Sequence, residues 1–575
     1  MTKVNVTIDG NKYEVPGDIT VLEACKQAGI DIPVLCYHPD LRAVGSCRIC
    51  VVEVEGQRVY QPSCAYPVND GMVINTNTKE VREARKAALE LILSRHPQDC
   101  LKCERNTSCE LQALAADFGM TDVYYSNVLP AFKTEAESGV IVREHEKCIN
   151  CGRCVRACQE VQTVNALEYY KRGYEKIVLP TGGKKLHETT CTYCGQCINV
   201  CPTGALHEND ETGKVWEWIE DPNLHVVIQT APAIRVSIGE AMGLEPGYLS
   251  TEKMVGAIRK LGFDKVFDTD FTADLTIMEE GHEFLHRLKN GGTLPMVTSC
   301  SPGWIKFMET FYSDMIPNIS TCKSPQQMFG ALAKTYYPEK AGLDASKIKV
   351  VSIMPCTAKK YECNRPEMKS SGYQDVDVVL TTRELAKMMK VAGIDFEEIQ
   401  TSKFDDPFGI TTGAAAIFGS SGGVMEAALR TVYEVVTGET LPSVDFEGVR
   451  GLDGVKEATV RVGELDVNVA IANGLSNARK VLDKVKSGEA NYHFIEIMCC
   501  PGGCIGGGGQ PRPTSPEKRK ARMEAIYCED ANMTLRKSHE SPAIDTIYKE
   551  FLKEPLGEKS HHLLHTHYTK RDWNI

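Results

Sequence analysis

The sequence lacks the features that would place the chain in a membrane or on a nucleic acid. It has no apolar run as long as a membrane span requires, and Met1 leads directly into an alternating, strand-like segment rather than a targeting segment. Its formal net charge of -12 has the wrong sign for binding nucleic acid or an anionic membrane surface. We therefore expect a cytoplasmic protein with no membrane span and no nucleic-acid partner.

Two nucleotide-binding signatures are also absent. No strand-like run is followed by Gly-x-Gly-x-x-Gly, and the glycine run at 506–509 is not followed by Gly-Lys-Ser/Thr. A nicotinamide, flavin or nucleotide-phosphate site is therefore not expected in this chain. Close backbone approach to a cofactor explains the glycine run better.

Cysteine, by contrast, is abundant. The 575-residue chain contains 24 cysteines, and its length exceeds what one hydrophobic core organises, so we expect several domains. Thiols stay free in a reducing compartment, and a chain of this size needs no disulfides for stability. Metal binding therefore explains the cysteines better than disulfides do.

The first cysteine block belongs to a domain predicted at residues 1–80. A hairpin is indicated at 4–15, and a helix that begins with the capping box of Thr20 and Glu23 ends near Gly29. Four cysteines follow, at separations of ten, two and thirteen residues: Cys36, Cys47, Cys50 and Cys64. This arrangement resembles the plant-type ferredoxin fold around a 2Fe–2S cluster, in the version found at the N-termini of complex I large subunits and large hydrogenases.

The second block, in the domain predicted at 81–125, follows a helical pattern over 81–93. Its candidate metal ligands are His96, Cys100, Cys103 and Cys109. Three thiolates and one imidazole suit zinc as well as an iron–sulfur cluster, and spacing alone leaves that choice open. The position between two cluster domains favours a 4Fe–4S cluster with one histidine ligand. The competing interpretation of His96 is a solvent-exposed residue before Pro97.

The third block, in the domain predicted at 126–209, contains the most specific motif in the chain. The pattern Cys-x2-Cys-x2-Cys-x3-Cys occurs twice, and Pro202 follows the second copy. This is the run of two-cluster bacterial ferredoxins, in which the fourth cysteine of each copy ligates the other cluster. One 4Fe–4S cluster is therefore assigned to Cys148, Cys151, Cys154 and Cys201, and the other to Cys191, Cys194, Cys197 and Cys158.

In residues 210–575, short apolar runs alternate with helical patterns, which indicates an α/β domain with parallel sheet. Active sites in such domains lie beyond the carboxyl ends of the strands. Three of the apolar runs are followed directly by cysteines, namely Cys300, Cys356, Cys499, Cys500 and Cys504. Thiolates gathered from three remote segments indicate a further metal site.

Three segments around these cysteines resemble the signature segments of the FeFe (iron-only) hydrogenases. They are Thr298-Ser-Cys-Ser-Pro-Gly-Trp304, Met354-Pro-Cys-Thr-Ala-Lys-Lys-Tyr-Glu362 and Glu496-Ile-Met-Cys-Cys-Pro-Gly-Gly-Cys504, the last followed by the glycine run. The resemblance extends over essentially the whole chain, and the domain order is similar to that of large clostridial-type enzymes and of catalytic subunits of NAD(P)-linked hydrogenases.

The resemblance implies reversible oxidation of molecular hydrogen to protons and electrons at an H-cluster. This cofactor is a 4Fe–4S unit joined through one thiolate to a two-iron unit that carries CO, cyanide and an azadithiolate bridge. Maturation factors insert the two-iron unit. Matching positions imply three H-cluster ligands, Cys356, Cys500 and Cys504, of which the last bridges the two iron units.

The fourth H-cluster ligand stays open. The family pattern has two adjacent cysteines at the positions of Cys300 and Ser301, of which the first relays protons and the second ligates the 4Fe–4S unit. A thiolate is favoured over a serine alkoxide because it is the softer iron ligand and forms more readily. The candidates are Cys300, Ser301 and Cys499.

Heterolytic cleavage of hydrogen releases a proton, which needs a relay of titratable groups within hydrogen-bond reach. The resemblance implies a relay of Cys300, Glu280, Ser320, Glu283 and Arg287. The two glutamates are three residues apart in a predicted helix and so share one face. Without the resemblance, each would be interpreted as an ordinary surface carboxylate.

Three further residues are expected at the H-cluster by the same resemblance. Lys359 is expected to hold a cyanide ligand by a charge-assisted hydrogen bond, and Met354 and Met498 are expected to pack around the two-iron unit. Four other cysteines are expected to be buried structural thiols: Cys25, Cys322, Cys363 and Cys528. The four histidines of the tail are expected at a solvated helix end: His561, His562, His565 and His567.

The expected fold is thus multidomain, α+β and α/β. It comprises a plant-type 2Fe–2S ferredoxin-like domain (1–80), a small His/Cys3 4Fe–4S domain (81–125), a bacterial two-cluster ferredoxin domain (126–209) and a large two-lobed α/β H-cluster domain (210–575). The expected cofactors are the H-cluster, one 2Fe–2S cluster and three accessory 4Fe–4S clusters.

Electrons are expected to pass to ferredoxin or to a flavin- or NAD(P)-binding partner subunit. In a complex with such a subunit, electron bifurcation is possible. A low-turnover hydrogen sensor is the alternative, because Ser301 replaces a family cysteine. Against the sensor, no signalling domain is visible, and four accessory clusters suit sustained electron flow.

Overall fold

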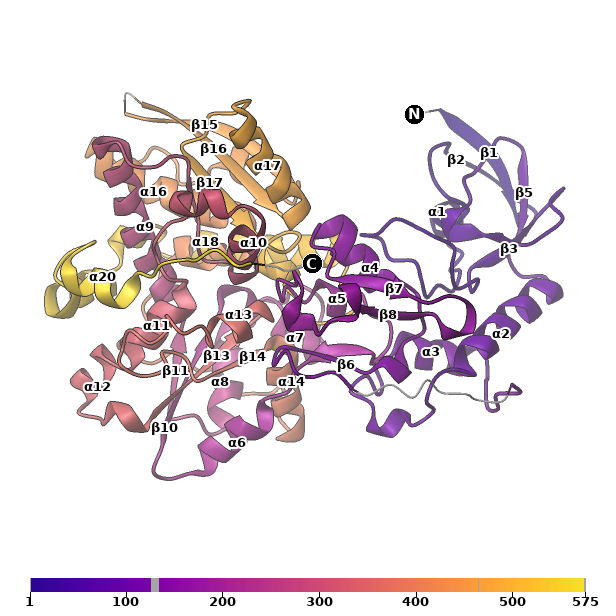
Figure 1. Cartoon of the computed structure of the whole chain (residues 1–575), viewed down its shortest axis with the longest axis horizontal. Coiled ribbons are helices and arrows are strands. Elements are labelled where there is room, and N and C mark those ends of the chain that lie inside the picture. The colour runs from indigo at the N-terminus through magenta and orange to yellow at the C-terminus, as the bar shows by residue number, and fades with distance from the viewer. Residues whose placement is uncertain (1, 126–133, 464, 573–575) are drawn as a thin grey trace.

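The computed structural model describes residues 2–125, 134–463 and 465–572. Figure 1 shows the N-terminal sheet at one end of the molecule, a two-lobed region at the other, and the short helices of the third cysteine block between them. The predicted domain boundary at 125 adjoins residues 126–133, which lie outside the described residues.

The N-terminal part is a five-stranded sheet with one helix against it. Its strands are β1 (Lys3–Ile8), β2 (Asn11–Pro16), β3 (Val51–Val54), β4 (Gln61–Pro62) and β5 (Met72–Asn75), in the order β2-β1-β5-β3-β4. The turn between β1 and β2 holds Asp9 and Gly10 at positive φ, which a tight hairpin turn requires. Helix α1 (Val21–Gln27) begins with the capping box of Thr20 and Glu23. The predicted hairpin and helix are confirmed.

Short elements carry the second and third cysteine blocks. They are α2 (Lys79–Leu93), α3 (Glu110–Asp117), α4 (Arg153–Arg156), α5 (Gln196–Asn199), β6 (Ile141–Arg143), β7 (Leu167–Tyr170), β8 (Ile177–Pro180) and β9 (Leu206–Glu208). The repeated motif also repeats in the backbone, since Gly152 before α4 and Gly195 before α5 have φ of 72° and 70°. Glycine adopts this left-handed conformation without strain, so each copy turns into its helix in the same way.

The two lobes are built on two four-stranded sheets. The first has the order β11-β10-β13-β14 and is parallel throughout, and the second has the order β12-β17-β16-β15. Their strands are β10 (His225–Thr230), β11 (Lys265–Asp268), β12 (Met296–Val297), β13 (Ile348–Met354), β14 (Val378–Thr381), β15 (Val455–Val462), β16 (Leu465–Asn473) and β17 (Phe494–Met498). The α/β prediction is confirmed, with β15 as the antiparallel exception.

Helices cover both sheets (Figure 1). They are α6 (Thr212–Glu220), α7 (Ile238–Ala241), α8 (Thr251–Lys260), α9 (Asp270–Asn290), α10 (Pro302–Phe311), α11 (Pro325–Ala333), α12 (Tyr336–Ala341), α13 (Ala358–Glu362), α14 (Thr382–Val391), α15 (Gly413–Ala416), α16 (Gly423–Thr437), α17 (Leu475–Ser487), α18 (Pro516–Asn532), α19 (Pro542–Ile547) and α20 (Glu558–Leu564). Helix α9 is 21 residues long and largely buried, although it carries several carboxylates. These carboxylates need internal partners, because an unpaired buried charge is costly.

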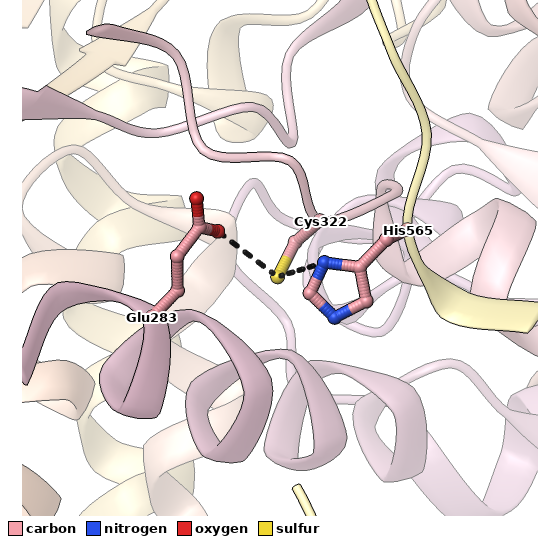
Figure 2. A group of neighbouring side chains, drawn as sticks. All are labelled: Glu283, Cys322 and His565. Carbon is pink, nitrogen blue, oxygen red and sulfur yellow. Dashed lines mark hydrogen bonds between the residues drawn. The ribbon is translucent and has the colours of Figure 1, made fainter. Parts of the chain in front are cut away.

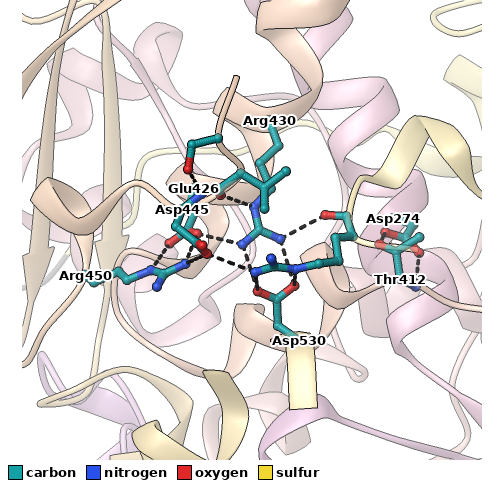
Figure 3. A network of polar contacts seen from close by, with 10 residues as sticks. Asp274, Thr412, Glu426, Arg430, Asp445, Arg450 and Asp530 are labelled. Carbon is teal, nitrogen blue, oxygen red and sulfur yellow. Dashed lines mark hydrogen bonds and ion pairs between the residues drawn. The ribbon is translucent and has the colours of Figure 1, made fainter. Parts of the chain in front are cut away.

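A buried ion-pair network ties the C-terminal segment to the second lobe (Figure 3). Arg430 of α16 lies 2.7 Å from Glu426 and 2.8 Å from Asp530 of α18, and all three side chains are fully buried. Arg450 and Arg536 extend the network with second contacts to Glu426 and Asp530. Because each carboxylate meets two guanidinium groups, the desolvation cost of burying these charges is offset locally.

Among the residues that the structure describes, no helix is both long enough and apolar enough to cross a membrane.

Candidate active site and cluster-binding sites

The four cysteines of the first block lie against one another in the loops around β3. The backbone N–H of Cys47 donates to Cys36 Sγ at 3.5 Å, and hydrogen bonds from the thiols of Cys47 and Cys64 lower the pKa of Cys36. A further thiol hydrogen bond from Cys64 lowers the pKa of Cys50. Four thiols in mutual contact fit a 2Fe–2S cluster, which takes four thiolate ligands.

His96 of the second block is prepared as a ligand. Its Nδ1 lies 2.7 Å from the carbonyl oxygen of Pro97, so Nδ1 carries the proton and Nε2 keeps its lone pair. Nε2 is buried and has no hydrogen-bond partner among the described residues. The solvent-exposed interpretation of His96 is therefore wrong. The side chain lines one cavity with the three thiols of its block, Cys100, Cys103 and Cys109.

The eight cysteines of the double motif line two cavities. One cavity is lined by Cys148, Cys151, Cys154 and Cys201, and the other by Cys158, Cys191, Cys194 and Cys197. The fourth cysteine of each copy thus lies with the other copy, which is the arrangement that the crossed ligand assignment requires. Burial raises the pKa of Cys154 and Cys197 well above that of a free thiol. Thiolates form there only beside a strong positive charge, such as that of iron.

The remaining predicted thiols meet at the carboxyl ends of strands from both sheets. Cys356 follows β13 of the first sheet, and Cys500 and Cys504 follow β17 of the second. Burial raises the pKa of Cys356, and the proximity of Cys500 and then Cys504 raises it further. Burial likewise raises the pKa of Cys504 to about 12. Three converging thiols whose thiolates need positive charge fit the iron–sulfur part of an H-cluster.

Cys300 and Cys499, two candidates for the fourth ligand, have different neighbours. Burial raises the pKa of Cys300, and the charge of Glu280 raises it further, while Lys359 opposes the shift. Cys499 is buried, and its thiol is hydrogen-bonded with the thiols of Cys194 and Cys500. The charges that act on the Cys300 thiol thus include the carboxyl group of Glu280, whereas Cys499 lies between two sets of thiols.

Ser301 is held by the backbone. Its Oγ accepts a hydrogen bond from the N–H of Cys499 at 3.2 Å. Gly303 leaves room for the neighbouring thiol, since an added Cβ there would lie 2.7 Å from Cys499 Sγ. The Cys499 side chain thus fills the space beside the start of α10, where the family pattern has its second cysteine.

The residues predicted around the two-iron unit are also at this site. Lys359 Nζ donates to the carbonyl oxygen of Cys300 and to Glu362, each at 3.1 Å, so its ammonium group is fixed beside the thiols. Met354 and Met498 are each 3% exposed, at the ends of β13 and β17. A fixed cation and apolar walls suit the holding of small anionic ligands in a dry site.

The glycine run serves close packing of protein against protein. An added Cβ on Gly508 would collide with the backbone of Cys194 and Gly195, and one on Gly507 with the carbonyl group of Pro355. Asn199 of α5 donates to the carbonyl oxygen of Gly507 at 2.9 Å. The expected close approach is therefore to neighbouring backbone. It brings the third cysteine block against the site formed by Cys356, Cys500 and Cys504, which we call the H-site.

Three of the predicted relay residues, Ser320, Glu283 and Arg287, are joined by hydrogen bonds. Glu283 accepts hydrogen bonds from Ser320 Oγ at 2.9 Å and from Arg287 Nη2 at 2.6 Å. Burial raises the pKa of Glu280 to about 8, while hydrogen bonding from Ser320 opposes the shift. Glu280 and Glu283 are 3% and 8% exposed. They are therefore not surface carboxylates, and Glu280 is neutral near pH 7, able both to donate and to accept a proton.

Family models match the chain in five segments. The model for the C-terminal domain of the iron only hydrogenase large subunit matches residues 224–508, and the model for the iron hydrogenase small subunit matches residues 516–571. A 2Fe–2S iron–sulfur cluster binding domain matches 1–79, the NADH-ubiquinone oxidoreductase-G iron–sulfur binding region matches 85–123, and a 4Fe–4S dicluster domain matches 147–205.

The NADP-reducing hydrogenase subunit HndD of Solidesulfovibrio fructosivorans is 52% identical over 584 residues, covering 99% of this chain and 100% of that protein. The chain belongs to the iron-only (FeFe) hydrogenase family. Iron hydrogenase 1 of Clostridium pasteurianum is 40% identical to this chain over 574 residues, covering 98% of this chain and 100% of that protein. A solved structure of an apo FeFe hydrogenase from Chlamydomonas reinhardtii is 43% identical, covers 63% of this chain and 99% of that one, and has a TM-score of 0.57.

These matches confirm the predicted family, the multidomain fold and the hydrogenase activity, in which hydrogen oxidation is coupled to electron relay through iron–sulfur clusters. They also decide the second cysteine block in favour of iron–sulfur chemistry over zinc. They give the alternative of a hydrogen sensor no support.

Two expectations about structural residues were wrong. Cys528 is exposed rather than buried, because it lies on the outer face of α18. His565 is 6% exposed rather than solvated, because the chain after α20 returns to pair with the segment at Cys322. Sequence reasoning also missed the contact between Cys194 and Cys499. The available signal was the extra cysteine, Cys499, directly before the predicted ligand Cys500.

Proposed function

We propose that this hydrogenase is the hydrogen-cleaving subunit of an NADP-linked, multisubunit enzyme in the cytoplasm. The proposal is supported by the full-length similarity to an NADP-reducing hydrogenase subunit. It is also supported by the absence of a dinucleotide-binding glycine motif from this sequence. Reduction of NADP in that arrangement takes place on a flavin- or NADP-binding partner subunit. Ferredoxin is a further electron acceptor, which would make the complex electron-bifurcating.

The proposed cofactor set is one 2Fe–2S cluster, three accessory 4Fe–4S clusters and an H-cluster whose two-iron unit is inserted by maturation factors. The chemistry supplied by the bound groups is hydrogen cleavage at the two-iron unit and one-electron transfer at the iron–sulfur clusters. The observation that carries the proposal is the position of Cys499, whose thiol contacts both an accessory-cluster thiol, Cys194, and an H-site thiol, Cys500. The cluster set that contains Cys194 is therefore adjacent to the active site, which suits electron transfer between them.

The residues of this chain hold the cofactor and move the proton. Lys359 fixes an ammonium group beside the thiols, where it binds an anionic ligand. Cys300 faces Glu280, so the thiol passes its proton to that carboxyl group and then, through Ser320, to Glu283. Because these groups are buried, water does not carry the proton along another route.

We also propose that Cys499, with Cys356, Cys500 and Cys504, holds the 4Fe–4S part of the H-cluster. Each iron of such a cluster takes one protein ligand, so a fourth thiolate is needed. Cys499 contacts Cys500 and fills the space beside Ser301, whereas Cys300 faces the proton relay. The serine hydroxyl is occupied by the backbone N–H of Cys499.

A ligand-exchange experiment tests this assignment. Cys499→Ala should remove the H-site 4Fe–4S signal from the electron paramagnetic resonance spectrum and lower the iron content, while the accessory signals remain. Adding Ser301→Cys to Cys499→Ala should restore the signal, because the thiolate then returns to the family position. An intact H-site signal in Cys499→Ala would assign the fourth ligand elsewhere, and Cys300→Ala and Ser301→Ala in the same background would then locate it.

A reconstitution experiment tests the electron partner. The purified, matured chain should oxidise hydrogen with an artificial dye but should not reduce NADP. Hydrogen-dependent NADP reduction should appear only after the co-purifying subunits are added, with reduced ferredoxin as a second product if the complex bifurcates. Reduction of NADP by the isolated chain would overturn the proposal, as would a purified native complex that transfers electrons to ferredoxin alone.

A further inference from the structure

The predicted end of the relay, Arg287, is unsuited to carry a proton. A guanidinium group stays charged at every physiological pH and has no lone pair to accept a proton. Besides its 2.6 Å ion pair with Glu283, its N–H groups donate to backbone carbonyl oxygens, including that of Ile319 at 2.8 Å. Arg287 therefore anchors Glu283, and a proton that reaches Glu283 needs another group to leave by.

Two titratable side chains, Cys322 and His565, continue from Glu283 (Figure 2), at the carboxylate oxygen that Arg287 leaves free. Cys322 Sγ lies 3.9 Å from Glu283 Oε2 and 4.0 Å from His565 Nδ1. Cys322 is fully buried and His565 is 6% exposed. The carboxyl group of Glu283, the thiol of Cys322 and the imidazole of His565 thus lie in a row. A thiol beside a carboxyl group therefore occurs at both ends of the proposed relay, at Cys300 and at Cys322.

His565 is oriented to accept a proton at Nδ1 and leads to the surface. Its Nε2 lies 3.1 Å from Glu279, a carboxylate whose pKa is raised by burial but lowered overall by hydrogen bonds from His565 and other donors. Nε2–H therefore donates to Glu279, and Nδ1 accepts from Thr321 Oγ1 at 2.8 Å and lies 4.0 Å from the Cys322 thiol. The ring of His561, an exposed residue, stacks on that of His565 at 4.7 Å.

The charged and titratable groups around Cys322 and His565 come from every element packed against them. Helix α9 contributes three carboxylates, the segment after β12 contributes hydroxyl groups, and the C-terminal segment contributes histidine and tyrosine. These groups are Glu279, Glu280, Glu283, Ser320, Thr321, Tyr548, His561 and Tyr568. The carboxyl groups of Glu279 and Glu283 favour a positive charge at the two stacked imidazoles, whereas a charge on His565 opposes one on His561.

The same three side chains form a potential metal-ligand group, since their ligand atoms lie within 4.8 Å of one another. Their existing bonds argue against a resident metal. Glu283 is already paired with Arg287 and accepts from Ser320, and both ring nitrogens of His565 have polar partners. A resident cation would have to break these contacts and lie beside a guanidinium group.

We propose that Cys322 and His565 form the proton exit from Glu283, which opens to solvent beside His561. In each transfer the Glu283 carboxyl gives its proton to Cys322 Sγ while the thiol proton moves to His565 Nδ1. The thiol ends the step neutral, and solvent takes the proton from the imidazolium. The proposal rests on the relay of the proposed function and continues it beyond Glu283.

Double-variant kinetics of the matured enzyme test the exit. Cys322→Ala and His565→Gln should each lower hydrogen turnover roughly 10²-fold, the lower end of the 10²- to 10⁴-fold that a positioned proton-transfer group contributes. Glu283→Gln should lower turnover further. In the Glu283→Gln background, Cys322→Ala should change nothing more, since both groups act on one path.

The control for general disturbance is Cys363→Ala, which removes another buried thiol of the first lobe that is not part of this line. It should leave turnover and its pH profile unchanged. Infrared bands of the H-cluster should be the same in all variants, which shows that assembly is intact. An equal loss from Cys322→Ala in the wild-type and Glu283→Gln backgrounds would mean a structural role and would overturn the exit.

Two readouts separate this exit from the relay itself. The S–H stretching band of Cys322, assigned by its loss in Cys322→Ala, should shift in His565→Gln even in protein without the two-iron unit, because the thiol loses its acceptor. An unshifted band would contradict the proposed contact. If Glu283→Gln left turnover unchanged, the relay of the proposed function would fail. If Glu283→Gln abolished turnover while His565→Gln did not affect its pH dependence, the relay would stand and the exit alone would fail.

Discussion

The accessory cluster sites and the H-site are built in opposite ways. Each accessory set draws its ligands from one or two short cysteine-rich segments, with left-handed glycines such as Gly152 and Gly195 repeating one local turn. The H-site draws its thiols from the ends of strands in two different sheets. Loss of tertiary structure in the two lobes should therefore destroy the H-site while the local sets keep much of their geometry.

The largest expected effect on activity comes from removing one cysteine ligand of the H-site and, separately, one cysteine ligand of an accessory cluster. Cys356→Ala should lower hydrogen–deuterium exchange by more than about 100-fold, because changes to residues that only support a metal ligand already cost roughly 10- to 100-fold. Cys201→Ala should leave this exchange nearly intact but slow hydrogen-dependent dye reduction, because it interrupts electron transfer rather than hydrogen cleavage. Mass-spectrometric exchange and dye assays on the same samples measure both. Equal loss of exchange in the two variants would contradict the separate roles of the H-site and the accessory clusters.

The buried network of the second lobe should matter next. Asp530→Ala leaves Arg430 with an incomplete set of partners in a fully buried position, which should cost about 3–5 kcal/mol of folding free energy. The loss should appear in the unfolding of the two-lobed region and not in that of the N-terminal sheet, as followed by tryptophan fluorescence and by the visible absorption of the 2Fe–2S cluster.

The matched control is Asp545→Ala, which breaks a pair with Lys549 between two largely exposed side chains. Exposed pairs contribute at most about 1 kcal/mol, so this variant should unfold almost like the wild type. A comparable destabilisation by both substitutions would show that the buried network contributes no more to folding free energy than an exposed ion pair.

A pH dependence of stability is expected at Asp274, a buried carboxyl group of α9 that is hydrogen-bonded to Thr412 (Figure 3). Burial raises its pKa to about 7. Because the folded pKa lies above that of an unfolded aspartate, its contribution to stability is full below about pH 4 and is lost as pH rises through about 7. The loss amounts to at most about 1.4 kcal/mol per pH unit over that window.

Asp274→Asn should therefore gain stability relative to the wild type between about pH 4 and pH 7 and keep a constant difference above pH 7. Denaturant titrations at several pH values check this. A stability difference that does not change with pH would show that Asp274 is ionised in the folded protein.

The fold of the N-terminal part was largely predictable because its signals are local. The capping box at Thr20 and the hairpin turn at Asp9 act within a few residues, and the two-cluster motif specifies its own crossed arrangement. The antiparallel strand β15 was not predicted, because strand direction depends on how a connection returns to the sheet rather than on the apolar pattern.

The H-site was predictable only in part. The resemblance to the family named its thiols and its relay residues, but it left the fourth ligand open. The contacts of Cys499 with Cys194 and Cys500 narrow that choice. Cys499 and Cys194 are more than 300 residues apart in the sequence, and no local spacing rule reaches that far.

The sequence by itself determined the family and the order of the cluster domains, and it predicted the accessory ligand sets, because thiolate spacing and local turns encode geometry over a few residues. Only the tertiary structure decided that Glu280 and Glu283 are buried and that the thiol of Cys499 lies among those of two sites. It also decided that His565 comes back from the C-terminus to meet Cys322. Burial and long-range contact depend on how sheets and helices pack, and packing is a property of the whole fold rather than of any one segment.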